Sequence, residues 1–309
     1  MNIKRAQIEV SSRCNFKCIT CKHGYYEYGQ DLPNNICEML IKDILPGLEV
    51  LELQGTGESL LSDMTGRLVK AAAENDTAVT LITNGSLLTN QIMELLVSAG
   101  TQLVISLDGS NKETYTAHRP VGNFDTIIKN IRRINEIRNR TPSTGFSIVV
   151  NMVLTQLNRS DIPDMIELLS SLGVDFLFVS EVRECMPDSK VWGNLNLLSE
   201  SLTPAFKLMI LECENLAKRK SIGFAFNPNI KPNGIKKTVC EAPWKHIFVS
   251  SNGDVSVCCE LSKPFGNLNK QSLVDILFGE ELQKFQDNML SGHYDQHCLN
   301  CCLPWGLPY

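Results

Sequence analysis

Short apolar segments alternate with helical patterns through residue 220, and this alternation restricts the fold more than any other feature. Six segments are rich in Val, Ile, Leu or Phe, which is typical of parallel strands covered on both faces. They comprise residues 7–10, 50–53, 79–82, 103–107, 146–153 and 176–179. The helical patterns between and after them comprise residues 36–45, 64–74, 90–99, 124–138, 162–172 and 204–220. Such a series predicts an α/β fold with a parallel sheet and right-handed crossovers, either an open doubly wound sheet or a partial barrel.

The pattern changes after residue 222. Residues 224–234 contain two prolines and three asparagines, which indicates a linker or an irregular crossing. Residues 247–258 predict a β-hairpin with an Asn-Gly turn, and residues 272–290 predict a helix with Gly279 as a break point. At about 150 residues per domain, the length suits roughly two domains. We therefore expect a first domain over residues 1–222 and a small α+β domain over residues 223–309.

Composition excludes several classes of function. The apolar fraction of 43% is enough for a sizeable core, and the net charge of −5 comes with no basic stripe, so nucleic acid is not an expected partner. No run of 18 apolar residues predicts a membrane span. Residues 1–7 lack the apolar region of a signal peptide, so the expected location is the cytoplasm.

Three of the 12 cysteines follow the first predicted strand: Cys14, Cys18 and Cys21. In a parallel α/β fold, the loop after a strand lies on the functional face. In a long chain without a signal peptide, clustered cysteines indicate metal ligands or catalytic thiols rather than disulfides. Three thiolates can hold a 4Fe–4S cluster and leave one iron open. The alternative is zinc, which normally needs a fourth ligand, and His23 is the nearest candidate.

The spacing of these cysteines, CxxxCxxC, resembles the signature of the radical SAM superfamily. That resemblance implies a partial (β/α)₆ TIM-like barrel with the signature on the loop after its first strand. It also implies that the open iron binds the amino and carboxylate groups of S-adenosylmethionine (SAM). Reductive cleavage of SAM, with electrons from a flavodoxin- or ferredoxin-type partner, then yields a 5′-deoxyadenosyl radical that abstracts a substrate hydrogen.

A second segment that resembles the family follows the second strand. Gly55, Thr56, Gly57 and Glu58 resemble the family's GGE motif, with Thr56 in place of one glycine. Glycines allow a ligand to approach the backbone closely, and backbone carbonyls can accept hydrogen bonds from the methionine ammonium. The alternative is a simple glycine turn.

Further matches follow the later strands in order. Asn84 belongs to a Thr-Asn-Gly segment, and Ser106 and Asp108 belong to a Ser-x-Asp-Gly segment that the resemblance places near the ribose. Arg119 resembles a family arginine that approaches the methionine carboxylate, a charge-assisted contact. Ile19 occupies a position in the cysteine loop that is often aromatic in the family and packs beside the adenine.

The C-terminal cysteines resemble a second family pattern. Cys240 precedes the predicted hairpin, Cys258 ends it, and Cys298 and Cys301 form a later CxxC pair. This order resembles the SPASM/twitch domains that follow radical SAM barrels and hold an auxiliary 4Fe–4S cluster. The chain ends eight residues after Cys301, so we expect one auxiliary cluster, as in the twitch-like form. Four ligands leave no open iron, so electron transfer is its expected use. Structural zinc is the alternative.

Two of these cysteines are doubled, as Cys258-Cys259 and Cys301-Cys302. Adjacent strand residues point to opposite faces, so the sequence leaves open which member of each pair is the ligand. The spare thiol could return a hydrogen atom to a substrate radical, as the resemblance implies for radical SAM epimerases. Cys259 is the first candidate and Cys185, after the sixth strand, is the second. The alternative is that Cys259 only packs.

These features give three hypotheses of different classes. The leading one is a radical SAM epimerase of a small polar natural product, such as a sugar, an aminoglycoside or a peptide. The second is a radical SAM dehydrogenase that oxidises a secondary alcohol with the auxiliary cluster as electron acceptor. The third is a zinc-stabilised α/β binding module. Glu181, Arg183 and Glu184 could meet a polar substrate at the mouth of the barrel or could be solvated charges.

Overall fold

The computed structural model describes residues 3–21, 29–142, 145–182, 195, 203–227, 240–261, 263–299 and 301. The chain forms two compact units that do not follow chain order. The first unit comprises Met1–Ser12, Gln30–Val79 and Ile230–Tyr309, and the second comprises Arg13–Gly29 and Thr80–Asn229. The domain boundary expected at residue 222 stays a prediction. No helix in the described ranges is long and apolar enough to cross a membrane.

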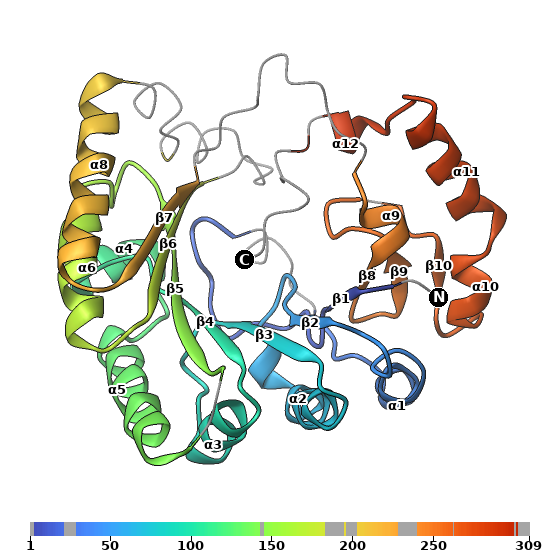
Figure 1. Cartoon of the computed structure of the whole chain (residues 1–309), viewed down its shortest axis with the longest axis horizontal. Coiled ribbons are helices and arrows are strands. Elements are labelled where there is room, and N and C mark those ends of the chain that lie inside the picture. Colours follow the sequence, from blue (N-terminus) through green and yellow to red (C-terminus); the bar gives the residue numbers. More distant parts are fainter. Residues whose placement is uncertain are drawn as a thin grey trace. The chain divides into compact units, whose positions relative to one another are not determined.

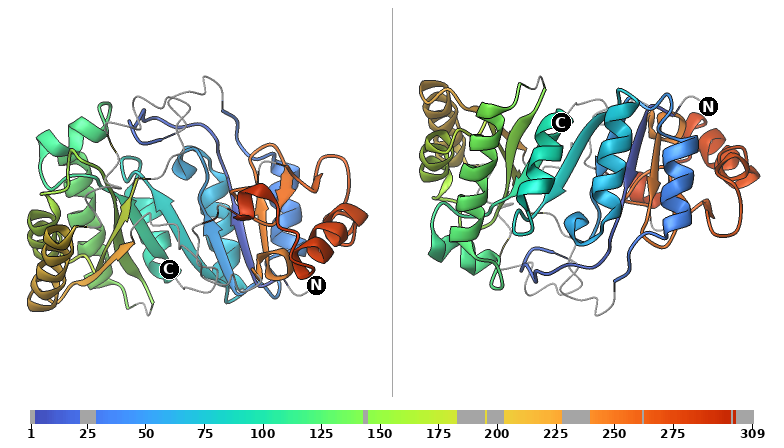
Figure 2. Two further views of the ribbon diagram at one scale, coloured as in Figure 1. Left: turned by 90° about the horizontal axis from the view of Figure 1, so that it is seen from above. Right: turned by 90° about the horizontal axis from the view of Figure 1, so that it is seen from below.

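The second unit contains a parallel sheet with helices along one side. Its strands run in the order β3 (Ala78–Thr83), β4 (Gln102–Ser106), β5 (Ser147–Leu154), β6 (Phe176–Glu181) and β7 (Gly223–Asn227). Its helices are α3 (Asn90–Ser98), α4 (Lys112–His118), α5 (Phe124–Arg140), α6 (Ile162–Ser171) and α8 (Pro204–Arg219). Figures 1 and 2 show α5, α6 and α8 along the outer side of β4–β7.

The core of this unit lies between the strands and these helices. On β5, every second residue from Ile148 to Leu154 is fully buried, while the residues between them are half-buried. This alternation follows from the two-residue period of a strand. The opposite face of the sheet is therefore the less covered one. There Ser106, Asn151 and Phe178 lie side by side in the strand register.

The strand β7 corrects one expectation. The prolines and asparagines of residues 224–234 predict a linker, but residues 223–227 form a strand parallel to β6. The reason is the Phe-Ala-Phe segment ahead of the first proline, where Phe226 packs against Phe206 of α8 with the ring centres 5.6 Å apart. The strand therefore includes Asn227, the first asparagine of this segment.

The first unit has strands in the order β10 (Gly266–Asn267), β9 (Asp254–Ser256), β8 (His246–Val249), β1 (Arg5–Ile8) and β2 (Val50–Leu53). The predicted hairpin is confirmed as the antiparallel pair β8–β9. The parallel pairing of β8 with β1 is a finding that the sequence did not predict, and β1 also pairs in parallel with β2. This pairing places the hairpin beside the first strand of the chain.

Helices α1 (Asn34–Asp43) and α2 (Met64–Glu74), with the short 3-10 helix η2 (Ser59–Leu61), belong to the same unit. Its C-terminal helices are α9 (Ala242–Lys245), α10 (Leu273–Leu277), α11 (Glu280–Leu290) and α12 (Gln296–Leu299). The predicted break at Gly279 is confirmed, because Gly279 precedes the first residue of α11. A Cβ atom at Gly279 would lie 2.8 Å from the Asp275 carbonyl oxygen, so the tight connection between α10 and α11 requires glycine.

Candidate active site

The first cysteine group lies on a short loop of the second unit. Cys14, Cys18 and Cys21 are all half-buried. The Cys21 N–H donates to the Cys18 carbonyl at 3.2 Å, and the Phe16 N–H donates to Cys14 Sγ at 3.4 Å. Burial raises the pKa of the Cys18 thiol to about 11, and Cys14 and Cys21 add to the shift. The three thiols thus share one loop and act on one another electrostatically, although within the described residues they are not already arranged around a single metal ion.

A buried ion pair lies beside this loop. Arg119 Nε donates to Asp108 Oδ2 at 2.7 Å, and Arg119 Nη1 donates to Cys18 Sγ at 3.6 Å. Asp108 is fully buried, and its second oxygen accepts the Val153 N–H at 2.8 Å. Burial lowers the pKa of Arg119, but Asp108 and Cys18 raise it by more, so the guanidinium stays charged. The sequence predicted separate cofactor contacts for Arg119 and Asp108, and it did not predict that they pair.

Asn84 is tied to the cysteine loop. Its amide nitrogen donates to Asn15 Oδ1 at 2.9 Å, and its own Oδ1 accepts the backbone N–H of Ser86 at 2.9 Å. Asn15 Nδ2 in turn donates to Ser86 Oγ at 2.9 Å. This ring of amide and hydroxyl bonds fixes the loop after β3 to the residue that follows Cys14. In this structure Asn84 positions the cysteine loop, and its contact with the cofactor stays a prediction.

Ile19 and Ser106 lie in different surroundings. Ile19 packs against an apolar cluster formed by Val182 and Leu195, and its backbone N–H donates to the His118 carbonyl at 3.0 Å. Ser106 is half-buried at the end of β4, beside Asn151 of β5. The side-chain oxygen of Asn151 is buried, with no hydrogen-bond partner among the described residues. Sequence reasoning missed Asn151, although a polar residue inside the apolar run 146–153 was the available signal.

In the first unit, the side chain of Glu9 packs against and hydrogen-bonds the loop from Gln54 to Glu58. A Cβ atom at Gly55 would lie 2.3 Å from Glu9 Cγ, so this position requires glycine. Glu9 Oε1 accepts hydrogen bonds from the backbone N–H and the hydroxyl of Thr56, both at 2.7 Å. The other carboxylate oxygen, Glu9 Oε2, accepts the backbone N–H of Ser251 at 3.1 Å and its hydroxyl at 3.0 Å. Thr56 therefore has a structural use that a glycine could not supply.

The other residues of this loop differ in exposure. Gly55 and Thr56 are exposed and Gly57 is half-buried, so the backbone of this segment is open to a ligand. Glu58 is buried, and its carboxylate accepts the Leu60 N–H at 3.1 Å as the cap of η2. The loop is thus a glycine turn of fixed shape whose exposed backbone can also accept a ligand.

The second cysteine group gathers in the first unit. Burial raises the pKa of Cys240 to about 11, with Cys298 and Cys301 adding to the shift, and Cys301 also acts on Cys258. The Cys301 N–H donates to the Cys298 carbonyl at 3.3 Å. Within the ranges that the structure describes, no three of these side chains are already arranged around a single metal ion. Four thiolates can hold either a 4Fe–4S cluster or a structural zinc ion, so the donor set alone is compatible with both.

The two members of the Cys258-Cys259 pair differ. Cys258 is 8% exposed and belongs to an apolar cluster with Val257 and Leu282, whereas Cys259 is exposed. The neighbouring Cys258 thiol lowers the pKa of Cys259, and the Gln7 side chain lowers it further.

Some predicted residues lie outside the described residues, namely His23, Arg183, Glu184, Cys185 and Cys302. Glu181 is described, and it is only 4% exposed, on the same side of β6 as Leu177 and Val179. A residue that meets a substrate at the mouth of the barrel, or a solvated charge, would be exposed, whereas Glu181 is buried.

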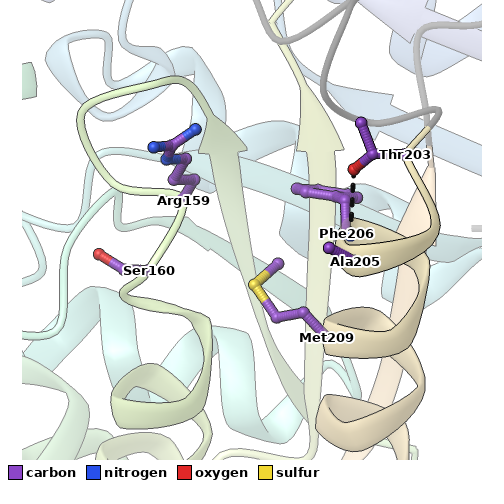
Figure 3. Close-up of a pocket in the computed structure, with 6 residues that line it drawn as sticks. All are labelled: Arg159, Ser160, Thr203, Ala205, Phe206 and Met209. Atoms are coloured by element: carbon purple, nitrogen blue, oxygen red, sulfur yellow. Dashed lines mark hydrogen bonds between the residues drawn. The ribbon is translucent and has the colours of Figure 1, made fainter.

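A hollow of about 370 Å³ lies between the loop before α6 and the start of α8 (Figure 3). Its lining is Arg159, Ser160, Thr203, Ala205, Phe206 and Met209. The Thr203 hydroxyl accepts the Phe206 N–H at 3.2 Å and caps α8 there. None of the site residues predicted from the sequence lines this hollow, so it is not part of the candidate site.

Comparison with known proteins agrees with this geometry. The model of the radical SAM superfamily matches residues 8–177, and the model of the SPASM iron-sulfur cluster-binding domain matches residues 240–302. The AdoMet-dependent heme synthase of Methanosarcina barkeri is 28% identical over 95% of this chain and 89% of its own length. The tungsten-containing aldehyde ferredoxin oxidoreductase cofactor-modifying protein of Pyrococcus furiosus is 26% identical over 60% of this chain, and the match spans about half (53%) of that protein.

Solved structures show the same fold. SuiB of Streptococcus suis, bound to S-adenosylmethionine, superposes with a TM-score of 0.71 at 18% identity, over 91% of this chain and 67% of SuiB. The enzyme anSMEcpe, with bound AdoMet, gives a TM-score of 0.71 at 16% identity, over 97% of this chain and 83% of that one. The fold of the chain is thus the partial TIM-like barrel of these enzymes followed by a small C-terminal domain.

The family determines the cofactors, which are SAM, a SAM-binding 4Fe–4S cluster and an auxiliary cluster. The side chains fit them, because one loop gathers three thiols and the C-terminal region gathers four more. An all-sulfur donor set of this kind is the one that iron–sulfur clusters require. The chain therefore belongs to the radical SAM superfamily and is a radical SAM enzyme with a C-terminal SPASM domain.

Proposed function

We propose that this enzyme is an epimerase that inverts a carbon centre of a small polar natural product or a peptide, with Cys259 as the hydrogen-atom donor. The observation that supports it most is the contrast within one pair of cysteines. Cys258 is buried in an apolar cluster, whereas Cys259 is exposed. In this proposal Cys258 is the cluster ligand, and Cys259 is the thiol that remains for chemistry.

The cofactor-binding residues follow the sequence motifs. Cys14, Cys18 and Cys21 hold the SAM cluster. The auxiliary cluster is held by Cys240, Cys258, Cys298 and Cys301. Bound together, SAM and its cluster supply a 5′-deoxyadenosyl radical that abstracts a hydrogen atom from the substrate. The guanidinium of Arg119 lies beside Cys18 and stays charged, so it suits the carboxylate of SAM.

Gln7 places Cys259 close to the glycine-containing loop. Its amide nitrogen donates to the Gln54 carbonyl oxygen at 3.4 Å, and the same side chain lowers the pKa of the Cys259 thiol. All three residues belong to the first unit. If the loop from Gln54 to Glu58 contacts SAM, the Gln7 side chain then lies between this cofactor loop and the Cys259 thiol.

Hydrogen-atom transfer from Cys259 would complete the inversion. Abstraction leaves a carbon radical on the substrate and a C–H bond in 5′-deoxyadenosine. The Cys259 S–H bond then breaks, and its hydrogen atom forms a new C–H bond on the opposite face of the carbon. The thiyl radical left on Cys259 takes one electron and one proton to become a thiol again. A reductant of the flavodoxin or ferredoxin type supplies the electron.

A peptide belongs among the substrate classes because peptides accompany several relatives. Solved structures show SuiB bound to the precursor peptide SuiA and anSMEcpe bound to the Cp18Cys peptide. AlbA of Bacillus subtilis, a protein of the biosynthesis of the bacteriocin subtilosin, is 23% identical over 97% of this chain and 65% of its own length. These substrates are those of the relatives, and for this enzyme a peptide or a carbohydrate-like molecule of similar polarity is the proposed class.

Turnover in deuterium oxide tests the proposal, with aminoglycosides and short peptides offered as substrates. A thiol exchanges its hydrogen with solvent, so one deuterium should appear at the inverted carbon. Cys259→Ala should keep its iron and still form 5′-deoxyadenosine, but yield no epimer. Cys213→Ala, which removes a buried cysteine of α8, is the matched control and should give the wild-type product. A product two hydrogens lighter and free of deuterium would contradict the epimerase and favour the dehydrogenase.

A further inference from the structure

Tyr115 carries a buried hydroxyl group that the site described so far does not use. Its side chain on α4 is fully buried, and its ring packs against Phe124 with the ring centres 5.7 Å apart. The hydroxyl has no hydrogen-bond partner among the described residues. Buried polar groups are nearly always paired, so this hydroxyl indicates an acceptor other than the residues that the structure describes.

The hydroxyl lies beside the first cysteine group. A Cβ atom at Gly122 would lie 2.5 Å from Tyr115 Oη and 2.9 Å from Phe16 Cε2, so both groups border the same small space. Phe16 belongs to the cysteine loop. Burial raises the pKa of Tyr115 to about 12, and the charges of Arg119 and Cys18 act on it. All of these residues belong to the second unit.

The polar neighbours of Tyr115 are already engaged with other partners. The Asp108 oxygens accept from Arg119 and from the Val153 backbone. The guanidinium of Arg119 has no acceptor atom, and the His118 ring is bonded to the Thr114 carbonyl and the Thr155 hydroxyl. Among the described side chains that act on this hydroxyl, the acceptor that remains is the sulfur of Cys18 and of the cluster it would hold.

We propose that the Tyr115 hydroxyl donates a hydrogen bond to a sulfur atom of the SAM cluster. The inference depends on the ligand set Cys14, Cys18 and Cys21 proposed above. A donor at a cluster sulfur stabilises the reduced cluster, which carries more negative charge, and therefore raises its reduction potential. Tyr115 is thus a positioning residue that tunes how readily the cluster accepts the electron needed to cleave SAM.

The test compares Tyr115→Phe with the wild type after anaerobic reconstitution. Iron and sulfide content should be unchanged, and a redox titration followed by electron paramagnetic resonance should give a more negative midpoint potential. The signal that changes when SAM is added identifies the SAM cluster. In the cluster-free protein, the same variant should melt at an equal or higher temperature, because it removes an unpaired hydroxyl.

Thr101→Val is the matched control. Thr101 is fully buried in the same unit, and its hydroxyl also lacks a partner among the described residues, but it lies just before β4 and away from the cysteine loop in sequence. Its removal should leave the potential of the SAM cluster at the wild-type value. Gly122→Ala provides a second approach, because its methyl group would displace the Tyr115 hydroxyl, and it should shift the potential in the same direction as Tyr115→Phe.

A wild-type potential in fully loaded Tyr115→Phe would overturn the proposal, as would an equal shift in Thr101→Val. Should Tyr115→Phe fail to load a cluster, the potential of Gly122→Ala decides, and a wild-type value there overturns the proposal. A fault in the ligand set would appear differently. In that case the triple Cys14→Ala, Cys18→Ala, Cys21→Ala variant would keep the iron content of the wild type.

Discussion

The two cysteine groups of this enzyme are organised in opposite ways. Cys14, Cys18 and Cys21 lie on one short loop of the second unit, whereas the C-terminal group draws on positions from Cys240 to Cys301 of the first unit. A local group needs little folding to bring its thiols together, but it needs polar contacts to fix them. A distributed group exists only when the hairpin, α11 and the tail have folded. The number of cysteine ligands differs as well. Three ligands leave one iron of a 4Fe–4S cluster open, whereas four ligands leave none open.

Different interactions stabilise the surroundings of the two cysteine groups. The loop with Cys18 is held by the Asn84–Asn15 hydrogen bond and lies against the buried pair of Arg119 and Asp108. The C-terminal group rests on an apolar cluster in which Cys258 and Leu282 pack with Phe265 and Phe285. Charge and hydrogen bonds therefore dominate at the first site, and apolar packing dominates at the second.

The largest expected effect separates the members of one cysteine pair. Cys258→Ala should lose one cluster, about four of about eight irons, because it removes a ligand of the distributed group. Cys259→Ala should keep all of its iron. Iron and sulfide analysis after anaerobic reconstitution measures both. A loss of iron in Cys259→Ala with retention in Cys258→Ala would exchange their roles and remove Cys259 as a hydrogen donor.

The polar character of the first site predicts a large effect for Asp108→Ala. This change leaves Arg119 as a buried charge without its carboxylate, which typically costs about 3–5 kcal/mol of unfolding free energy. Urea denaturation of the cluster-free chain measures the loss. Lys220→Ala, which removes the half-exposed ion pair with Glu167, is the control and should cost about 0–1 kcal/mol. Equal losses in the two variants would show that burial of the Asp108 pair has no energetic importance.

The apolar character of the second site predicts a smaller loss for Leu282→Ala. Leu282 is 1% exposed on α11, and a Leu-to-Ala change in a core costs about 2–3 kcal/mol at the low end of the usual range. Leu290→Ala on the same helix removes an exposed leucine and should change the stability by about 0.5 kcal/mol or less. Thermal unfolding of the cluster-free protein compares them. A neutral Leu282→Ala would mean that the apolar cluster does not support the distributed cysteines.

The smallest effect concerns the charged pair of the first unit. Arg5 Nη2 donates to Glu52 Oε1 at 2.7 Å, and His246 Nε2 lies 3.9 Å from Glu52 Oε2. Burial raises the pKa of Glu52, but the neighbouring His246 ring and the Arg5 guanidinium outweigh it and hold the pKa below its usual value. Because Arg5 is one-third exposed, Glu52→Gln should cost only about 1 kcal/mol at neutral pH.

The pH dependence of that cost follows from the direction of the shift. A carboxyl whose pKa is lower in the folded state stabilises the fold above its unfolded pKa, about 4.3, and this contribution is lost as the pH falls through the folded value. The difference between Glu52→Gln and the wild type should therefore shrink below about pH 4.3. Denaturation at a series of pH values measures it, and a difference independent of pH would show that the carboxylate charge is not involved.

The sequence predicted the local features well. The strands, the helices, the hairpin and the break at Gly279 are confirmed, because each depends on periodicity or turn chemistry within a short segment. The cysteine groups were found by spacing alone. The pairing of β8 with β1 and the strand β7 were not predicted, because parallel pairing joins segments far apart in the sequence.

The positioning contacts of the site were also beyond sequence reasoning. Glu9 joins Thr56 to Ser251, and nothing in the run of residues near Glu9 indicates either partner. Tyr115 lies in the short helix α4, which the sequence did not predict, and only its buried hydroxyl without a partner among the described residues distinguishes it. Such contacts depend on three-dimensional proximity, which spacing along the chain does not encode.

The measurement that tests the central claim most directly is the iron and sulfide content of the triple variant Cys14→Ala, Cys18→Ala, Cys21→Ala after anaerobic reconstitution. Two separate clusters predict about eight irons in the wild type and about four in the variant. Four remaining irons would show that the C-terminal cysteines hold their own cluster while the loop holds the other. A variant that keeps all of the iron, or that keeps none, would contradict the assignment of one cluster to each group.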